Sequence, residues 1–155
     1  MSDNLSPEDR RRTMRAVKGK GTRVERQLFG MLSGMGIRGW RKNPEEIPGK
    51  PDVAFPCRRI AIFVDGCFWH RCPLHGTMPR ANGAWWLAKL DANVARDRDT
   101  DSRLREQGWT AVRIWEHEDA GSAAARVASV VRAARRAGAA RAGSQSCTDL
   151  ARGEK

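Results

Sequence analysis

Residues 51–65 have the sequence PDVAFPCRRIAIFVD, in which two short apolar runs, residues 53–55 and 60–64, flank a four-residue link. Apolar runs of this length predict strands, and so short a link predicts that they pair as a hairpin. A turn centred near Arg58 and Arg59 sets Asp52 opposite Asp65, with Cβ atoms about 5 Å apart. The two acids then share one sheet end and can serve one hard cation; the alternative is a pair of surface acids that end the strands.

The chain on either side of this hairpin predicts one α/β domain. Ser6 and Thr22 each precede an acid by three residues, a spacing typical of helix N-termini. Apolar periodicity and terminating glycines predict the remaining boundaries. The expected elements are helices over residues 6–17, 22 to Gly36 or Gly39, 85–107 and 123–137, and a strand over residues 110–115. We expect a basic arm over residues 1–21, a domain over 22–137 and a disordered tail over 138–155.

Positive charge is concentrated at the front of the chain. The formal net charge is +11, and residues 1–42 contain eleven Lys and Arg against four Asp and Glu. Such an excess gains affinity for nucleic acid by releasing counterions from phosphates, although a solvated basic surface explains the charge equally well. The sequence has neither a signal peptide pattern nor a run of 18 apolar residues. We therefore expect an intracellular protein with no membrane partner.

Two further acids are candidates for the same site. Glu25 lies three residues after Thr22, so a helix-capping role explains it without any chemistry. Asp97 lies in helical register with Leu90 and Val94, so its carboxylate is expected to be buried and to need a partner. That partner is either a histidine or a neighbouring arginine.

Two cysteines and two histidines have a spacing that suits zinc. Cys67, Cys72 and His75 form a C-x4-C-x2-H cluster, and His117 follows a strand that can return to the same place. The alternative is small buried cysteines with unrelated histidines. In a reducing cytosol no disulfide is expected, and the other two cysteines, Cys57 and Cys147, are left out of the zinc site.

His70 and the adjacent aromatic pairs complete the candidate residues. His70, which the zinc cluster does not use, is either a general acid or base or a hydrogen-bonded structural residue. In each of the pairs Phe68-Trp69 and Trp85-Trp86 at least one ring is hard to bury. Exposed rings in a basic protein can stack on bases or wedge between them, whereas core packing is the alternative.

Taken together, these residues resemble the very-short-patch repair (Vsr) DNA mismatch endonucleases, a branch of the restriction-endonuclease-like PD-(D/E)xK nucleases. The similarity extends from about Arg11 to about Glu118, and its pieces are specific only in combination. The matching pieces are residues 14–17 (MRAV), 22–25 (TRVE), 48–52 (PGKPD), 63–70 (FVDGCFWH), 72–76 (CPLHG), 93–98 (NVARDR) and 108–117 (GWTAVRIWEH).

The resemblance implies a mixed β-sheet flanked by helices, a structural zinc ion and Mg²⁺-dependent hydrolysis of the phosphodiester 5′ to the thymine of a T·G mismatch. Such mismatches arise when 5-methylcytosine deaminates. The implied Mg²⁺ ligands are Asp52 and the backbone carbonyl of Val64, with Glu25 and Asp65 in the same acidic pocket. Asp65 is a further implied Mg²⁺ ligand, at a position where some members of the family have a histidine.

The other implied roles concern His70 and the DNA. His70 acts on the attacking water or the scissile phosphate, and Asp97 orients its ring. The zinc ligands are the Cys67, Cys72, His75 and His117 foursome, in an order and type that differ from the best-known members. The implied DNA-binding residues, the first three as intercalating aromatics, are Phe68, Trp69, Trp86, Arg15, Asn93 and Lys89.

Two rivals and several partners follow. The chain is alternatively a restriction-type or structure-specific nickase with another trigger, or a zinc-stabilised DNA-binding module without catalysis. We expect a bacterial cytoplasmic, nucleoid-associated monomer that acts on double-stranded DNA, with a MutL-type repair protein as a possible partner and a functional link to a cytosine-C5 methyltransferase.

Overall fold

The computed structural model describes Ser6, Glu8, Asp9, Arg11, Arg12 and residues 21–141. Its described strands form one four-stranded mixed sheet in the order β1-β2-β3-β4. They comprise β1 (Arg41–Lys42), β2 (Val53–Phe55), β3 (Ile60–Asp65) and β4 (Thr110–Trp115). The first three are antiparallel neighbours, whereas β4 is parallel to β3. The predicted strands are confirmed; the two-residue edge strand β1 was not predicted.

The hairpin is confirmed, but its predicted register is wrong. Val53 pairs with Ile62 and Phe55 with Ile60, so the pairing is shifted by two residues from the one that sets Asp52 against Asp65. The connection is a 3-10 turn, Pro56–Arg58, that ends with Arg59 in the left-handed region at φ 50°. This tight turn closes the hairpin earlier than a turn centred on Arg58 and Arg59 would.

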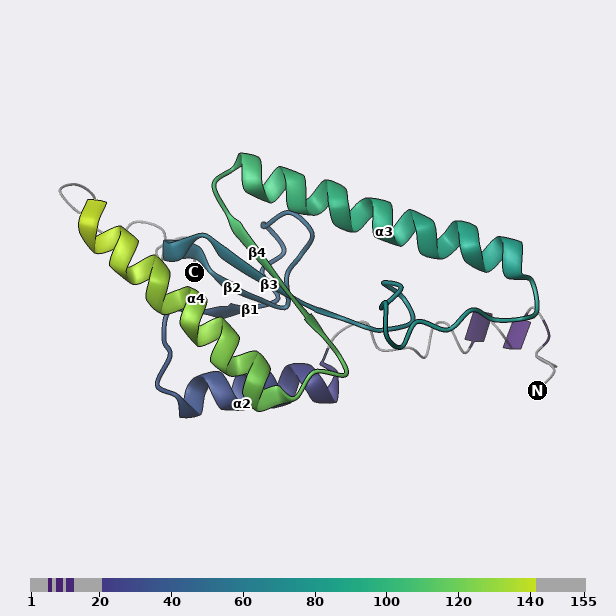
Figure 1. Ribbon diagram of the computed structural model, residues 1–155, viewed down its shortest axis with the longest axis horizontal. Helices are drawn as coiled ribbons and strands as arrows, with labels where there is room; N and C mark the ends of the chain where they lie inside the picture. The colour runs from purple at the N-terminus through teal and green to yellow at the C-terminus, as the bar shows by residue number, and fades with distance from the viewer. Residues whose placement is uncertain (1–5, 7, 10, 13–20, 142–155) are drawn as a thin grey trace.

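In the described part of the chain, three helices cover the sheet: α2 (Arg23–Gly34), α3 (Gly83–Glu106) and α4 (Ala120–Arg141). Figure 1 shows α3 on one side of the sheet and both α2 and α4 on the other. Leu28 and Leu32 of α2 and Val127 of α4 pack on Ile60 and Ile62, while Leu104 of α3 packs on Ala61 and Phe63 of the opposite face. The alternation along β3 therefore gives the sheet two buried faces. Its last residue, Asp65, falls on the α3 face.

The helix predictions hold with adjusted ends. Thr22 caps α2 with the predicted capping box. The third helix begins two residues before Trp85, and α4 extends past the predicted 123–137 at both ends. Residues 138–141, expected in the tail, thus continue α4, and residues 142–155 lie outside the described residues. In the predicted 6–17 helix, the described residues 8, 9, 11 and 12 are helical, and the Asp9 amide donates to Ser6 Oγ over 3.1 Å.

No helix in the described part of the chain combines the length and apolar character needed to cross a bilayer.

Candidate active site

Asp52 lies just before β2, against the end of β3. Its amide donates to the Ile62 carbonyl over 2.9 Å, and its Oδ2 accepts a hydrogen bond from the Val64 amide at 2.7 Å. Because the N–H and C=O of a strand residue point to the same side, the Val64 carbonyl faces the Asp52 side as well. Carboxylate and carbonyl oxygens are the donors that Mg²⁺ prefers, so this pair suits the implied metal.

His70 and Asp97 join the loop after β3 to α3 at the site. His70 Nδ1 lies 2.5 Å from Asp97 Oδ2 and 3.8 Å from Asp65 Oδ1. The ring belongs to the loop after β3, and its amide donates to the Gly66 carbonyl over 3.1 Å. The half-buried Asp97 thus has the histidine partner that its helical register predicted. A carboxylate on Nδ1 leaves Nε2 as the ring nitrogen available for chemistry.

Asp65 is held by an arginine that the sequence reasoning did not single out. Arg113 of β4 donates from Nη1 to both Asp65 oxygens, at 3.0 and 2.9 Å, and from Nε and Nη2 to Asp101 of α3. Burial raises the pKa of Asp65, while the charge of Arg113 acts in the opposite direction. The signal in the sequence was a lone arginine within an apolar strand, together with Asp97 and Asp101 one helical turn apart.

Glu25 performs the capping role that its spacing predicts. Its carboxylate accepts hydrogen bonds from the Gly21 amide at 2.8 Å and from the Thr22 hydroxyl at 3.0 Å, and the residue is 2% exposed. Across residues 21–141 and the few described residues before them, Glu25, Asp52 and Asp65 do not form a compact three-ligand group of the kind seen at the zinc candidates. The place of Glu25 in one acidic pocket with Asp52 and Asp65 stays a prediction.

The four predicted zinc ligands converge in space. One donor atom from each of Cys67, Cys72, His75 and His117 lies within 4.8 Å of all the others. Cys67 Sγ is 3.0 Å from His117 Nδ1, and Cys72 Sγ is 3.7 Å from the same atom. Two thiols and two imidazoles are the donor set of tetrahedral structural zinc sites, so these residues suit the ion.

The loop around these residues is built to hold the two thiols. The Cys67 amide donates to Glu116 Oε1 over 2.7 Å, which ties the loop to the end of β4. Burial, followed by the neighbouring Cys72 thiol, raises the pKa of Cys67 to about 11. A Cβ on Gly76 would lie 2.6 Å from the Cys72 carbonyl oxygen, so only glycine suits this turn. Glu116 was another residue that sequence reasoning missed.

Cys57, the described cysteine outside the four zinc candidates, was not expected to form a disulfide. Cys57 is disulfide-bonded, whereas Cys67 and Cys72 are free thiols. The expectation that no cysteine forms a disulfide is therefore wrong for Cys57.

The predicted aromatic pairs form one cluster beside the zinc candidates. Phe68 packs edge-on against Trp69 and Trp86, with ring centroids 5.0 and 5.3 Å apart. Trp86 is only 6% exposed, whereas Trp85, which was not predicted to bind DNA, is 53% exposed. Phe68 and Trp69 are half-buried. The buried Trp86 thus packs against Phe68 and Trp69, and its own contact with DNA stays a prediction.

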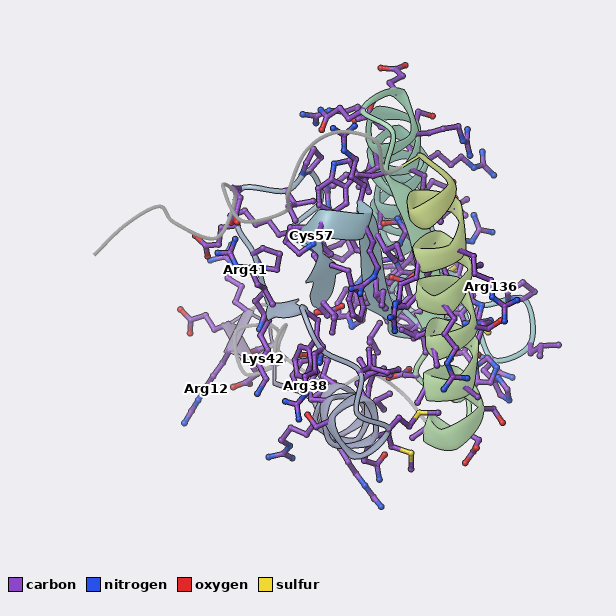
Figure 2. All side chains as sticks on the ribbon, turned by 90° about the vertical axis from the view of Figure 1, so that its left-hand side faces the viewer. Arg12, Arg38, Arg41, Lys42, Cys57 and Arg136 are labelled. Carbon is purple, nitrogen blue, oxygen red and sulfur yellow. The ribbon has the colours of Figure 1, made fainter. Side chains whose placement is uncertain are left out.

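The other predicted DNA-binding residues are placed as follows. Asn93 donates to the Trp69 carbonyl over 3.2 Å and so ties the loop after β3 that carries Phe68 and Trp69, the aromatic loop, to α3. Lys89 is exposed, with Nζ 5.6 Å from the centre of the Trp85 ring. Arg15 lies outside the described residues. Figure 2 shows Arg38, Arg41 and Lys42 along one side of the molecule, at and just before β1. The described helical residues before α2, which include Arg12, lie toward the opposite end of the long axis from β1 (Figure 1).

Comparisons with known proteins agree on one class. A family model described as DNA mismatch endonuclease Vsr matches residues 2–74. The type II nicking enzyme V.XorIIP of Xanthomonas oryzae pv. oryzae is 38% identical over 135 residues, covering 84% of this chain and 98% of that protein. The type II nicking enzyme V.NaeI of Lentzea aerocolonigenes is 42% identical, covering 76% of this chain and 74% of its own. The DNA mismatch endonuclease Vsr of Escherichia coli K12 is 37% identical, covering 75% and 74%.

The chain has a mixed sheet with acids at its end. Relatives named as nicking enzymes and as a mismatch endonuclease match three-quarters or more of the chain. Fold and relatives together define a DNA endonuclease. The chain belongs to the Vsr DNA mismatch endonuclease family.

Proposed function

We propose that the protein nicks one DNA strand on the 5′ side of the thymine in a T·G mismatch and so starts very short patch repair of deaminated 5-methylcytosine. The observation that carries the chemistry is the 2.5 Å contact between His70 and Asp97, because it couples a histidine on the aromatic loop to a carboxylate on α3. The relative from Escherichia coli, named a mismatch endonuclease, supports the choice of substrate.

In this proposal the work at the phosphate is divided between two sides of the site. Asp52 and the Val64 carbonyl hold Mg²⁺, which supplies charge stabilisation at the scissile phosphate. His70 accepts the proton of the attacking water or contacts the phosphate through Nε2. Asp97 fixes the tautomer and orientation of the ring through Nδ1.

Recognition of the mismatch is assigned to the aromatic cluster. Phe68 and Trp69 are partly exposed, and beneath them lies the buried Trp86. Rings that are held by a buried neighbour can wedge between base steps. The unstacking costs about a few kcal/mol per step, and it costs least where base pairing is already weak. A T·G pair is such a place. The basic front end, residues 1–42, would follow the phosphate backbone nearby.

Zinc has a structural role in this proposal. The four candidate ligands connect the loop after β3 to the end of β4, so an ion there would hold His70 and the aromatic rings in place. We expect one tightly bound zinc per chain. In Cys72→Ala, both the zinc and cooperative unfolding should be lost. Metal analysis that finds no zinc in freshly purified protein would remove this part of the proposal.

A nicking assay over mismatch type tests the proposal. End-labelled duplexes with a central T·G, T·A or C·G pair, and the single strand, are incubated with Mg²⁺ or EDTA. We expect one nick, 5′ to the thymine, in the T·G duplex with Mg²⁺ alone. Asp52→Ala should abolish it, and the exposed Asp99→Ala is the matched control. A T·G nick that survives Asp52→Ala would show that the metal site is assigned wrongly.

Nicking with another trigger is the second candidate, because V.XorIIP and V.NaeI are named type II nicking enzymes. Equal nicking of T·G and fully paired duplexes of the same sequence would favour it. DNA binding without any nick would favour the non-catalytic alternative instead. A cytoplasmic monomer linked to a cytosine-C5 methyltransferase and a MutL-type protein completes the proposal, and pull-down with purified MutL-type protein tests that partner.

A further inference from the structure

Arg113 lies within the edge strand β4, half-buried under α3, yet carries a full charge. In the parallel register it pairs with Phe63 of β3, and its guanidinium lies 4.8 Å from the centre of the Phe63 ring. Its side chain is 22% exposed. A guanidinium stays protonated in proteins, so this charge is permanent and needs compensation from the groups around it.

That compensation comes from three carboxylates on two elements. Arg113 Nη1 bonds both oxygens of Asp65, and Nε and Nη2 bond Asp101 at 3.1 and 2.9 Å. The third acid, Asp97, receives Nη2 on its backbone carbonyl at 3.3 Å, and its Oδ1 lies 3.5 Å from Nη1. All three guanidinium nitrogens are therefore used, and Nε and Nη2 bind Asp101 in the bidentate manner typical of arginine and carboxylates.

The same three acids would repel one another without the arginine. Asp65 is the most deeply buried of them, with a side chain that is 5% exposed. Three neighbouring carboxylates provide the hard oxygen ligands by which proteins bind divalent cations. Here a side chain supplies the positive charge, and a metal ion on Asp65 would lie next to a like charge.

We propose that Arg113 is the built-in cation of this acidic pocket, that it keeps Asp65 from serving as a metal ligand, and that it positions Asp97 for the contact with His70. The inference rests on the proposed function for the place of Mg²⁺ at Asp52. Arg113 is a positioning residue, since it touches Asp97 and not the reacting atoms.

The two ends of Asp97 show how this positioning works. Oδ2 faces His70 Nδ1 at 2.5 Å, while Oδ1 and the backbone carbonyl face Arg113. The carboxylate is therefore held in one rotation between an imidazole and a guanidinium. Removal of Arg113 leaves Asp97 held by His70 alone, and it takes from Asp65 and Asp101 the guanidinium that pairs with both.

The first test counts bound Mn²⁺ by EPR on zinc-loaded full-length protein, without turnover. In Asp65→Asn we expect a Mn²⁺ affinity within about threefold of wild type, whereas Asp52→Asn weakens it about tenfold or more. Arg113→Met should bind additional Mn²⁺, because its acids lose their cation. The double variant Asp65→Asn/Arg113→Met should lose that additional ion. A purely structural role for Arg113 predicts no extra ion.

The second test is kinetic, on the T·G duplex. Arg113→Met should lower kcat about tenfold or more with little change in KM, because positioning acts in the chemical step. Arg113→Lys, which keeps the charge but not the planar fork, should recover only part of the rate. The exposed Arg103→Met on α3 is the matched control, and it should match wild type in both tests.

Several outcomes would overturn the inference. Loss of Mn²⁺ in Asp65→Asn to the same extent as in Asp52→Asn would make Asp65 a metal ligand. If Arg113→Met folds but binds no additional Mn²⁺, the proposal that Arg113 acts as the cation of the acidic pocket is wrong. If the same variant has the kcat of wild type, the proposed positioning role is wrong. Wild-type protein that binds no Mn²⁺ would remove the Asp52 site on which the inference rests. Failure to nick T·G duplexes would instead contradict the proposed function and leave the Mn²⁺ counts unaffected.

Discussion

Asp97→Asn is the substitution that probes the His70 partnership most cleanly. Asparagine keeps the size and shape of the side chain but removes the charge that faces His70 Nδ1 at 2.5 Å. A hydrogen bond to a charged group contributes about 1.5–3 kcal/mol, and about 1.4 kcal/mol is a factor of ten in rate. We therefore expect kcat to fall about 10- to 150-fold, with KM for DNA unchanged because Asp97 does not touch the duplex in our proposal.

The assay is single-turnover nicking of a labelled T·G duplex under saturating enzyme, with thermal unfolding of each variant measured in parallel. Asp99→Asn is the control, because it makes the same change of charge two residues away on α3, where the carboxylate is 65% exposed and pairs with Arg103 at 3.8 Å. Its nicking rate should equal that of wild type. If Asp97→Asn folds normally and also nicks at the wild-type rate, the proposed role of the pair is wrong.

Three further predictions concern zinc and the core. Burial raises the pKa of Cys67 to about 11, so zinc must displace the proton of this thiol at neutral pH, and the second thiol ligand, Cys72, must lose its proton as well. The apparent zinc affinity should therefore rise by at least about tenfold per pH unit between about pH 6 and 8; a flat profile would contradict this. Gly76→Ala should weaken zinc binding about tenfold or more because its Cβ meets the Cys72 carbonyl, while Gly83→Ala, with nothing within 4 Å, should not. Leu32→Ala should lower the free energy of unfolding by about 2–5 kcal/mol, since Leu32 is fully buried; a denaturant titration measures this.

The parts of the fold that local chemistry determines were predicted well. The capping box at Thr22 and the apolar runs of β2 and β3 are signals carried by neighbouring residues. The hairpin register was not predictable in the same way. Arg59 adopts a left-handed conformation at φ 50°, and the sequence has no glycine at this position that would have indicated the turn. The edge strand β1 has two residues and no pattern of its own.

The candidate site shows the same division. Spacing brought the four zinc candidates together, and they do converge. Helical register predicted a buried Asp97, and the residue is half-buried. Its second partner, Arg113, comes from a strand that becomes adjacent only when β4 pairs in parallel with β3. Burial also divides Trp85 from Trp86 in a way that an adjacent pair in sequence does not reveal.

Cleavage of matched duplexes tests the central claim most directly. Two duplexes of identical sequence, one with a single T·G pair and one with T·A at the same position, are treated with zinc-loaded wild-type protein and with Asp52→Ala in Mg²⁺ buffer, and products are mapped on a sequencing gel. Our account predicts one nick 5′ to the mismatched thymine, made by wild type alone. Equal nicking of the T·A duplex, or a nick made by Asp52→Ala, would contradict it.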